Sequence, residues 1–212
     1  MHETNTERER LIDQIATALQ QRIPVDDSVF DRLYPDHVQR LSGLHFTPVS
    51  VALRAAAWLA PEPGLRVLDG GAGAGKLCLV AALSHAGHWQ GIERDASLAA
   101  VASAAARELA VAHCASFAVG DLLALDWRAF DSLYFYNPFE VALFGRAGRS
   151  DRSEYEDQIA AVQDRLGELA AGTRVVAFHG FGAEMPAGFV RAAVDGELAL
   201  WIKEPARRPG AM

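Results

Sequence analysis

Hydrophobic and polar positions follow two different patterns along the chain, and the change comes near residue 64. Before it, apolar residues recur at helical spacing among charged ones, which predicts helices over 5–22, 27–41 and 48–60. Beyond it, short apolar runs alternate with longer helical segments, a pattern typical of a parallel sheet covered by helices on both faces. The strands are expected at 65–68, 89–92, 115–119, 131–136 and 173–179, and the helices between them at 75–86, 96–110 and 152–170.

The alternation of strands and helices ends after residue 180. Two apolar runs, Phe189 to Val194 and Glu197 to Lys203, flank Asp195-Gly196, and an Asp-Gly pair in this position is a strong signal for a β-hairpin. Residues 181–188 are too few for the usual helix after the preceding strand. The pattern therefore predicts an N-terminal helical extension or lid over 1–63, a Rossmann-like α/β domain over 64–204 and a flexible tail over 205–212.

Composition narrows the possible functions. The 212 residues carry 20 Lys and Arg against 27 Asp and Glu, and the net charge of −7 argues against a general polyanion binder, although a local basic patch is compatible with it. The cysteines and histidines show no metal-ligand spacing, so we expect no metal site. No apolar run reaches the ~18 residues of a membrane span, and the charged N-terminus lacks the pattern of a signal peptide. We therefore expect a cytoplasmic protein without a membrane segment.

The most informative stretch is a glycine-rich turn after the first predicted strand, Val67-Leu68-Asp69-Gly70-Gly71-Ala72-Gly73-Ala74-Gly75-Lys76-Leu77. A phosphate-binding Walker A loop needs Ser or Thr after the lysine, where this chain has Leu77. The dinucleotide fingerprint is G-x-G-x-x-G, whereas this chain reads G-x-G-x-G from Gly71, which is one residue short. A tight turn without a ligand is a further alternative, but four glycines in six residues carry a considerable cost in backbone entropy.

Another interpretation accounts for more of this turn. Asp69-x-Gly71-x-Gly73-x-Gly75 resembles motif I of the class I S-adenosylmethionine-dependent methyltransferases. The resemblance implies that the glycines let the backbone approach S-adenosylmethionine closely, and that the Asp69 carboxylate receives the methionine ammonium of this cofactor. It also implies a three-layer α/β fold with seven strands in the order 3-2-1-4-5-7-6, mostly parallel with an antiparallel terminal strand.

Acidic residues continue the resemblance at the ends of the next two predicted strands. Glu93 stands where the family has a side chain that accepts hydrogen bonds from both ribose hydroxyls. Asp121 follows the third strand, and the resemblance implies that its carboxylate accepts from the adenine amino group while Leu122 covers the ring. Both carboxylates could instead cap helices, but Asp95 suits that role better than Glu93.

The expected acceptor side of the site follows the fourth predicted strand. Asn137-Pro138-Phe139 resembles motif IV of amino-directed methyltransferases, (Asn/Asp/Ser)-Pro-Pro-(Tyr/Phe), and the Asn-Asn-Phe element of non-SET lysine methyltransferases. The resemblance implies that Asn137 and the Pro138 carbonyl hold a target nitrogen, that Asn137 also borders the cofactor, and that Phe139 stacks near the target. Because the second proline is missing, the role of Phe139 and the target atom are left open. Glu140 is a candidate for removing a proton, or else an ordinary surface residue.

Two other features have a local and a functional interpretation. Thr47-Pro48 suits the start of a helix, with Thr47 as the N-cap, and it also resembles a Thr-Pro element that covers the methionine end of the cofactor in several amino-directed methyltransferases. A glycine-bearing loop carries Arg146, Arg149 and Arg152. These arginines could pair with a carboxylate or phosphate of the substrate, or belong to a solvated linker.

Together these features predict an S-adenosylmethionine-dependent methyltransferase that transfers the methyl group directly to a nitrogen nucleophile, on a protein side chain or a small molecule, and leaves S-adenosylhomocysteine. Three alternatives stay open: a non-catalytic S-adenosylmethionine-binding partner subunit, a nicotinamide-dependent oxidoreductase, and a nucleic-acid base methyltransferase, which the acidic net charge disfavours. The sequence does not predict an oligomeric state.

Overall fold

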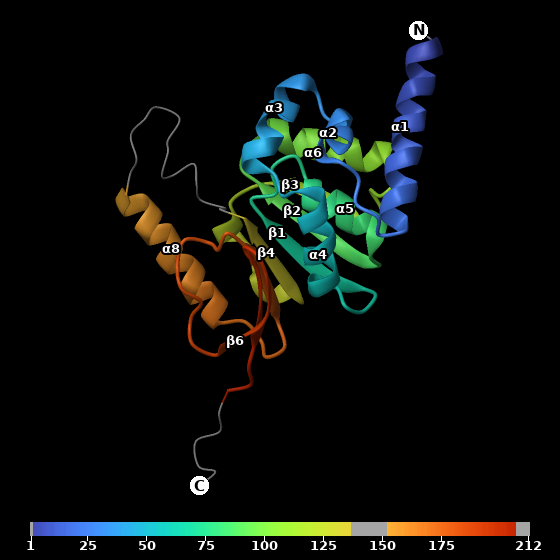
Figure 1. Ribbon diagram of the computed structural model, residues 1–212. Helices are drawn as coiled ribbons and strands as arrows, with labels where there is room; N and C mark the ends of the chain where they lie inside the picture. Colours follow the sequence, from blue (N-terminus) through green and yellow to red (C-terminus); the bar gives the residue numbers. More distant parts are fainter. Residues whose placement is uncertain (1, 137–151, 207–212) are drawn as a thin grey trace.

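The chain folds around one seven-stranded sheet with helices on both faces (Figure 1). The computed structural model describes residues 2–136 and 152–206, with the side chains of 6–136 and 155–206. Its strands are β1 (Leu65–Gly70), β2 (Gly87–Glu93), β3 (Ala115–Val119), β4 (Ser132–Tyr136), β5 (Arg174–Phe178), β6 (Phe189–Asp195) and β7 (Leu198–Lys203). Its helices are α1 (His2–Gln20), α2 (Asp27–Phe30), α3 (Asp36–His45), α4 (Val49–Leu59), α5 (Lys76–Ser84), α6 (Ala96–Glu108) and α8 (Arg152–Gly167), with short 3-10 helices η1 (Asp31–Leu33), η2 (Leu122–Ala124) and η3 (Trp127–Ala129).

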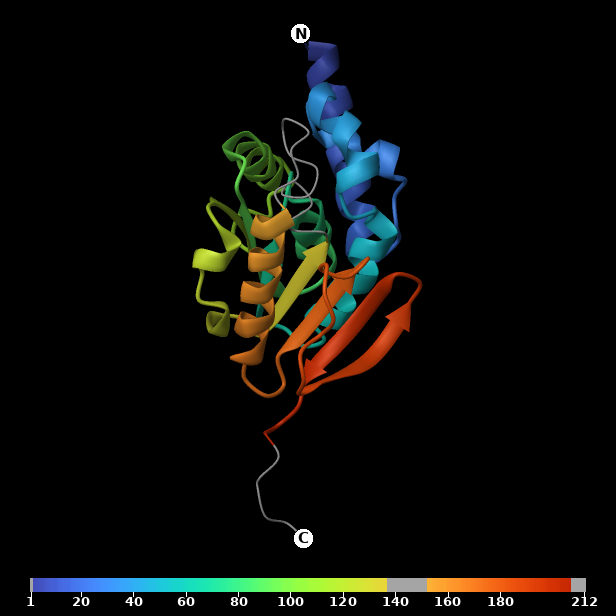
Figure 2. The same cartoon turned by 90° about the vertical axis from the view of Figure 1, so that its left-hand side faces the viewer.

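The strand order is β3-β2-β1-β4-β5-β7-β6, which confirms the predicted order. Strands β1 to β5 pair in parallel, and β7 lies antiparallel to both β5 and β6. Residues 179–188, between β5 and β6, contain no helix, as expected. The carboxyl ends of the parallel strands share one edge of the sheet, the upper edge in Figure 2, toward which the yellow β4 arrow points.

Two apolar clusters hold the layers together, one on each face of the sheet. Alternate strand residues separate onto these faces: along β4, Tyr134 belongs to one cluster, and Leu133 and Phe135 belong to the other. The first cluster continues without a break into α1 to α6, and α8 packs on the second (Figure 2). The helices before residue 64 therefore share a core with the sheet.

The predicted helix over 27–41 is divided in the structure. Tyr34 has φ −97° and ψ 155°, so η1 ends before it and α3 begins after Pro35. A proline disfavours helical backbone in the residue before it, which explains the break. The single predicted helix is therefore replaced by α2, η1 and α3, with a break at Tyr34-Pro35.

The helix expected from residue 48 begins one residue later, and Thr47 is not its cap. Pro48 occupies the N-cap position without a side-chain hydrogen bond, and the Asp27 carboxylate accepts from the backbone N–H of Val49 at 3.0 Å. The Thr47 hydroxyl instead shares a 2.8 Å hydrogen bond with the buried hydroxyl of Tyr134 on β4. The free backbone N–H of Val49 at the start of α4 therefore finds its acceptor in Asp27, more than twenty positions earlier in the chain.

Among the described helices, none combines the length and the apolar composition needed to cross a membrane.

Candidate functional site

The carboxyl ends of β1, β2 and β3 bring the predicted motif I residues to one edge of the sheet. β1 leads into the glycine loop, β2 ends at Glu93, and β3 leads to Asp121. The ends of these strands lie side by side. Gly70 at the end of β1 pairs with Ile92 on β2, and Glu93 at the end of β2 pairs with Val119 on β3. In open α/β sheets, ligands bind in the crevice at this edge.

Backbone conformation explains the glycines of the loop. Gly71, Gly73 and Gly75 have φ values of 81°, 56° and 78°, a region that side chains disfavour. A Cβ added to Gly75 would lie 2.5 Å from the ring of Phe117, and one added to Gly73 would lie 3.0 Å from the ring of Phe46. The loop is therefore both left-handed at three points and tightly packed.

Glu93 lies directly against this loop. Its two carboxylate oxygens accept from the backbone N–H groups of Gly73 and Asp95, each at 2.8 Å. Asp95 caps α6 by accepting from Ser97 N, so the capping role falls to Asp95, as expected. Each carboxylate oxygen can accept a second hydrogen bond, which leaves Glu93 able to bind ligand hydroxyls.

Asp69 is a buried carboxyl group beneath the loop, with 4% of its surface exposed. Burial raises the pKa of Asp69 to about 7; the Cys78 thiol, which donates to it at 3.6 Å, acts in the opposite direction, and the negative charge of Glu93 adds to the rise. A cationic ligand group beside Asp69 would favour the ionised carboxylate. The site therefore contains a buried acid that a positive charge can complement.

Asp121 has protein partners for both carboxylate oxygens. It caps η2 by accepting from Leu123 N at 2.9 Å, and its other oxygen accepts from Arg94 at 2.9 Å. Burial alone would raise the pKa of Asp121, but the hydrogen bonds from Leu123 and Arg94 together lower it. Leu122 is buried and lies over Gly70, where an added Cβ would come within 2.7 Å of it. Leu122 therefore lies against the glycine loop, while the Asp121 carboxylate is held by the first turn of η2 and by Arg94.

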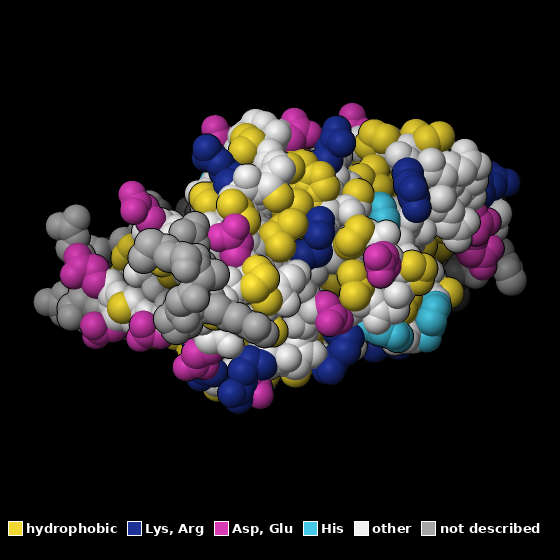
Figure 3. All heavy atoms as spheres, turned by 90° about the horizontal axis from the view of Figure 1, so that it is seen from below, with side chains coloured by type: hydrophobic (Ala, Val, Ile, Leu, Met, Phe, Trp, Pro, Cys, Tyr) yellow, Lys and Arg dark blue, Asp and Glu magenta, His cyan; other side chains and the backbone are white. Residues whose placement is uncertain are grey.

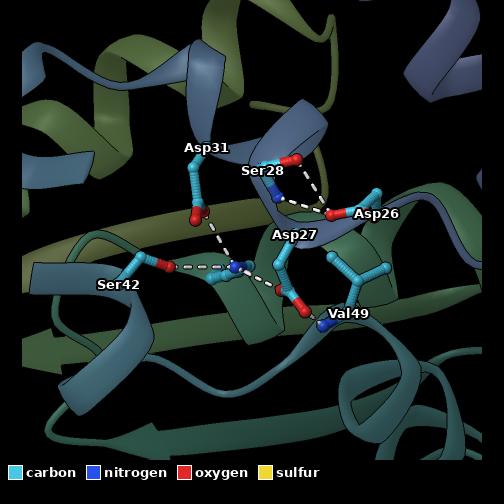
Figure 4. A network of polar contacts seen from close by, with 7 residues as sticks. Asp26, Asp27, Ser28, Asp31, Ser42 and Val49 are labelled. Atoms are coloured by element: carbon cyan, nitrogen blue, oxygen red, sulfur yellow. Dashed lines mark hydrogen bonds and ion pairs between the residues drawn. The ribbon is translucent and has the colours of Figure 1, made fainter. Parts of the chain in front are cut away.

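Lys76, at the start of α5, contacts residues of the N-terminal helices, Asp27, Asp31 and Ser42, which Figure 4 shows around one side-chain nitrogen. Its side chain is 2% exposed, and its Nζ lies 2.5 Å from Asp27, 2.8 Å from Asp31 and 3.0 Å from the Ser42 hydroxyl. An ammonium group has three N–H donors, and three oxygens surround this one. These contacts argue against the Walker A interpretation, because the amine that would bind phosphate is engaged with Asp27 and Asp31.

The corner between α3 and α4 covers the glycine loop. Phe46 is buried against Gly73 and contacts Tyr34 edge-on, with ring centroids 6.0 Å apart. Thr47 is joined to Tyr134, which pairs with Asp69 in the register of β4 and β1. Asp27 contacts both Lys76 and the start of α4, so the same ion pair fixes this corner.

The predicted acceptor residues Asn137, Pro138, Phe139 and Glu140 lie outside the described residues, as do Arg146 and Arg149 and the side chain of Arg152. The described strand end before them is Tyr136. Its ring contacts Phe178 with centroids 5.0 Å apart, and its hydroxyl donates to the Leu44 carbonyl at 3.4 Å.

The ion-pair network of Lys76 was not predicted from the sequence. A signal was present, because Lys76 precedes an apolar run, Leu77 to Ala82, on a helix that is buried along its length. A lysine in such a place needs an anionic partner. His179, at the end of β5, was also missed, and no local sequence pattern marks it.

Comparisons with protein-family models and with curated proteins gave no match. Solved structures do match. An RNA methyltransferase from Salinibacter ruber, in complex with S-adenosyl-L-homocysteine, is 25% identical with a TM-score of 0.53, over 78% of this chain and 97% of that chain. The chain has a class I methyltransferase fold.

Two further solved structures share this fold at 18% identity. The magnesium protoporphyrin IX methyltransferase ChlM from Synechocystis PCC 6803, with bound SAM, has a TM-score of 0.56 over 85% of this chain and 98% of that chain. TrmN from Thermus thermophilus has a TM-score of 0.54 over 78% of this chain, which spans only 52% of TrmN. The two neighbours whose names state an acceptor, an RNA methyltransferase and a magnesium protoporphyrin IX methyltransferase, differ in that acceptor.

Proposed function

We propose that this protein is an S-adenosylmethionine-dependent methyltransferase that methylates a nitrogen nucleophile on a protein side chain or a small molecule. One observation supports it most: the buried carboxyl of Asp69, the left-handed glycine loop and Glu93 converge at the carboxyl ends of adjacent strands in a methyltransferase fold. No phosphate cradle accompanies them, because Lys76 is engaged elsewhere.

The residues of the crevice fit S-adenosylmethionine. Asp69 is buried, with the Cys78 thiol as a weak donor, and an ammonium group would satisfy it. Glu93 and the loop backbone suit the ribose hydroxyls, and Leu122 suits one face of the adenine. The cofactor supplies an electrophilic methyl group on a sulfonium. Thr47 would cover the methionine end of the cofactor, next to Phe46, which packs against Gly73.

On the acceptor side, the assignment rests on the motif that follows β4. Asn137 and the carbonyl of Pro138 accept hydrogen bonds from the target nitrogen and orient its lone pair, and Phe139 stacks against the acceptor. The protein's contribution is orientation and desolvation, since no covalent enzyme intermediate is needed.

Charge favours a protein or small-molecule acceptor over a nucleic acid. The net charge is −7. On the face opposite the proposed site, Lys and Arg are interspersed with Asp and Glu (Figure 3). Nucleic-acid affinity depends mainly on clustered cations. We place the reaction in the cytoplasm, because the free cysteines Cys78 and Cys114 suit a reducing compartment.

Replacing Glu93 tests the cofactor site. Glu93→Ala is expected to weaken S-adenosylhomocysteine binding by roughly 1–3 kcal/mol, because buried ribose hydroxyls lose their acceptor. Titration calorimetry measures this change, with Glu108→Ala on exposed α6 surface as the matched control, expected to bind like the unchanged protein. Equal affinity in both variants would remove Glu93 from the site.

Replacing Asn137 separates an enzyme from a non-catalytic binding subunit. Asn137→Ala is expected to retain S-adenosylhomocysteine affinity and to lose methyl transfer by at least about 100-fold, because the target nitrogen is no longer oriented. Transfer is measured with tritiated-methyl S-adenosylmethionine and an extract of cells from which the gene is deleted. Full transfer by this variant would place the acceptor elsewhere.

A further inference from the structure

His179 has an unusual backbone conformation. It is one of three non-glycine residues with positive φ in the described ranges, with φ 56°; the others are Arg22 and Ala110. Arg22 and Ala110 come just after α1 and α6, where a left-handed residue commonly ends a helix. His179 follows a strand, where no such explanation applies. Strained residues of this kind persist only where their surroundings hold them, and they cluster at functional sites.

The hairpin holds the backbone of His179 in place. Its N–H donates to the carbonyl of Glu197 at 3.0 Å, in the turn between β6 and β7. Its Nδ1 lies 3.8 Å from the Glu197 carboxylate, so the acidic side chain faces one ring nitrogen and leaves Nε2 on the other side. The hairpin therefore holds the backbone of His179 and places an acidic side chain near its Nδ1.

The imidazole lies at the carboxyl edge of the sheet, beside the end of β4. Its ring centroid is 4.2 Å from that of Phe178 and 5.9 Å from that of Tyr136, the last described residue of β4. The side chain is 45% exposed, and the helix-free connection 179–188 follows it. Tyr136 and Glu197 are the titratable groups that face it from β4 and from the hairpin. His179 thus stands next to the strand end that leads to the proposed acceptor residues.

We propose that His179 is a catalytic residue that accepts the proton released by the methylated nitrogen, a role that rests on the proposed function. When a neutral N–H nucleophile forms its bond to the methyl carbon, the carbon–sulfur bond breaks and its electron pair stays on sulfur. The nitrogen gains positive charge as this bond forms, which makes its proton acidic. In the same step that proton passes to Nε2 of His179, giving an imidazolium beside Glu197, and then to solvent at the exposed edge of the ring.

Two variants separate this role from a structural one. His179→Gly removes the imidazole and relieves the positive φ, so its Tm is expected to equal or exceed that of the unchanged protein, by up to about 4 °C. His179→Asn keeps a residue that tolerates this conformation. Both are expected to lower turnover by at least about 100-fold while S-adenosylhomocysteine affinity stays within about twofold, and added imidazole should restore part of the turnover of His179→Gly. Ala110→Gly is the matched control for strain relief, with full turnover.

The assay measures tritium transfer from labelled S-adenosylmethionine to the extract of gene-deleted cells, next to S-adenosylhomocysteine titration of each variant. Loss of turnover with retained affinity and Tm, and rescue by imidazole, supports the role of His179. Full turnover in His179→Gly or His179→Asn overturns this role and leaves the proposed function standing. A loss of turnover that is explained by a lower Tm of the variant also overturns the role of His179 and leaves the proposed function standing. If the unchanged protein binds S-adenosylhomocysteine but labels nothing, the transferase and this role both fail; without binding, the cofactor assignment fails first.

Discussion

Lys76→Met is expected to lower the free energy of unfolding by about 3 kcal/mol, because it removes the cation from a buried ion-pair network. Methionine keeps most of the volume, so the loss is chiefly electrostatic. Asp31, with only 12% of its side chain exposed, is left as an uncompensated charge, while Asp27, 45% exposed, is partly rescued by water. Urea unfolding followed by circular dichroism measures the change, with the slope of the transition expected to stay constant.

An exposed ion pair provides the matched control for Lys76. Arg54 and Asp195 lie 3.0 Å apart with more than half of each side chain exposed, so Arg54→Met should change stability by less than about 0.5 kcal/mol. Adding Asp31→Asn to Lys76→Met is expected to recover part of the loss, because the buried charge disappears with its partner. Equal small losses for Lys76→Met and Arg54→Met would show that the network contributes little.

Lowering the pH from 7.5 to 5.5 is expected to weaken S-adenosylhomocysteine binding roughly 25-fold. Burial raises the pKa of Asp69 to about 7 in the free protein. The proposed ammonium contact needs the ionised carboxylate, so binding below pH 7 must release the proton from Asp69. The ionised fraction falls from about 75% at pH 7.5 to about 3% at pH 5.5, and affinity falls with it. Above pH 8, Asp69 is ionised and this dependence ends.

Calorimetry across this pH range tests the prediction, with Asp69→Asn as the reference. This variant should bind weakly at every pH and lose the dependence, which separates Asp69 from histidines that titrate in the same range. A pH dependence that survives in Asp69→Asn would assign the titration to another group and contradict the ammonium contact.

The alternating apolar runs after residue 65 predicted the strands and helices of the sheet well, because each element carries its own periodicity. Asp195-Gly196 likewise marked the hairpin locally. The strand order followed from the family resemblance, since periodicity contains no information on which strands are neighbours. The break at Tyr34-Pro35 was predictable from the proline, and the single helix proposed there was wrong.

The candidate site likewise has one part that a local sequence motif predicts and another part that depends on contacts between distant residues. Asp69, the glycines and Glu93 form a local, ordered motif, so the sequence could predict that they lie together at one edge of the sheet. The partner of Thr47 is Tyr134, 87 residues away, and Lys76 meets Asp31 and Ser42 across 45 and 34 residues. Such contacts depend on how helices and strands pack, which sequence spacing does not encode. The conformation of His179 likewise depends on the pairing of β5 with β7.

Titration calorimetry with S-adenosylhomocysteine at pH 8 tests most directly whether the glycine loop binds S-adenosylmethionine, with NAD and ATP as comparators. We expect micromolar binding of S-adenosylhomocysteine and no measurable binding of either nucleotide. A folded protein that binds NAD or ATP instead, or none of the three, would contradict this expectation and reassign the glycine loop.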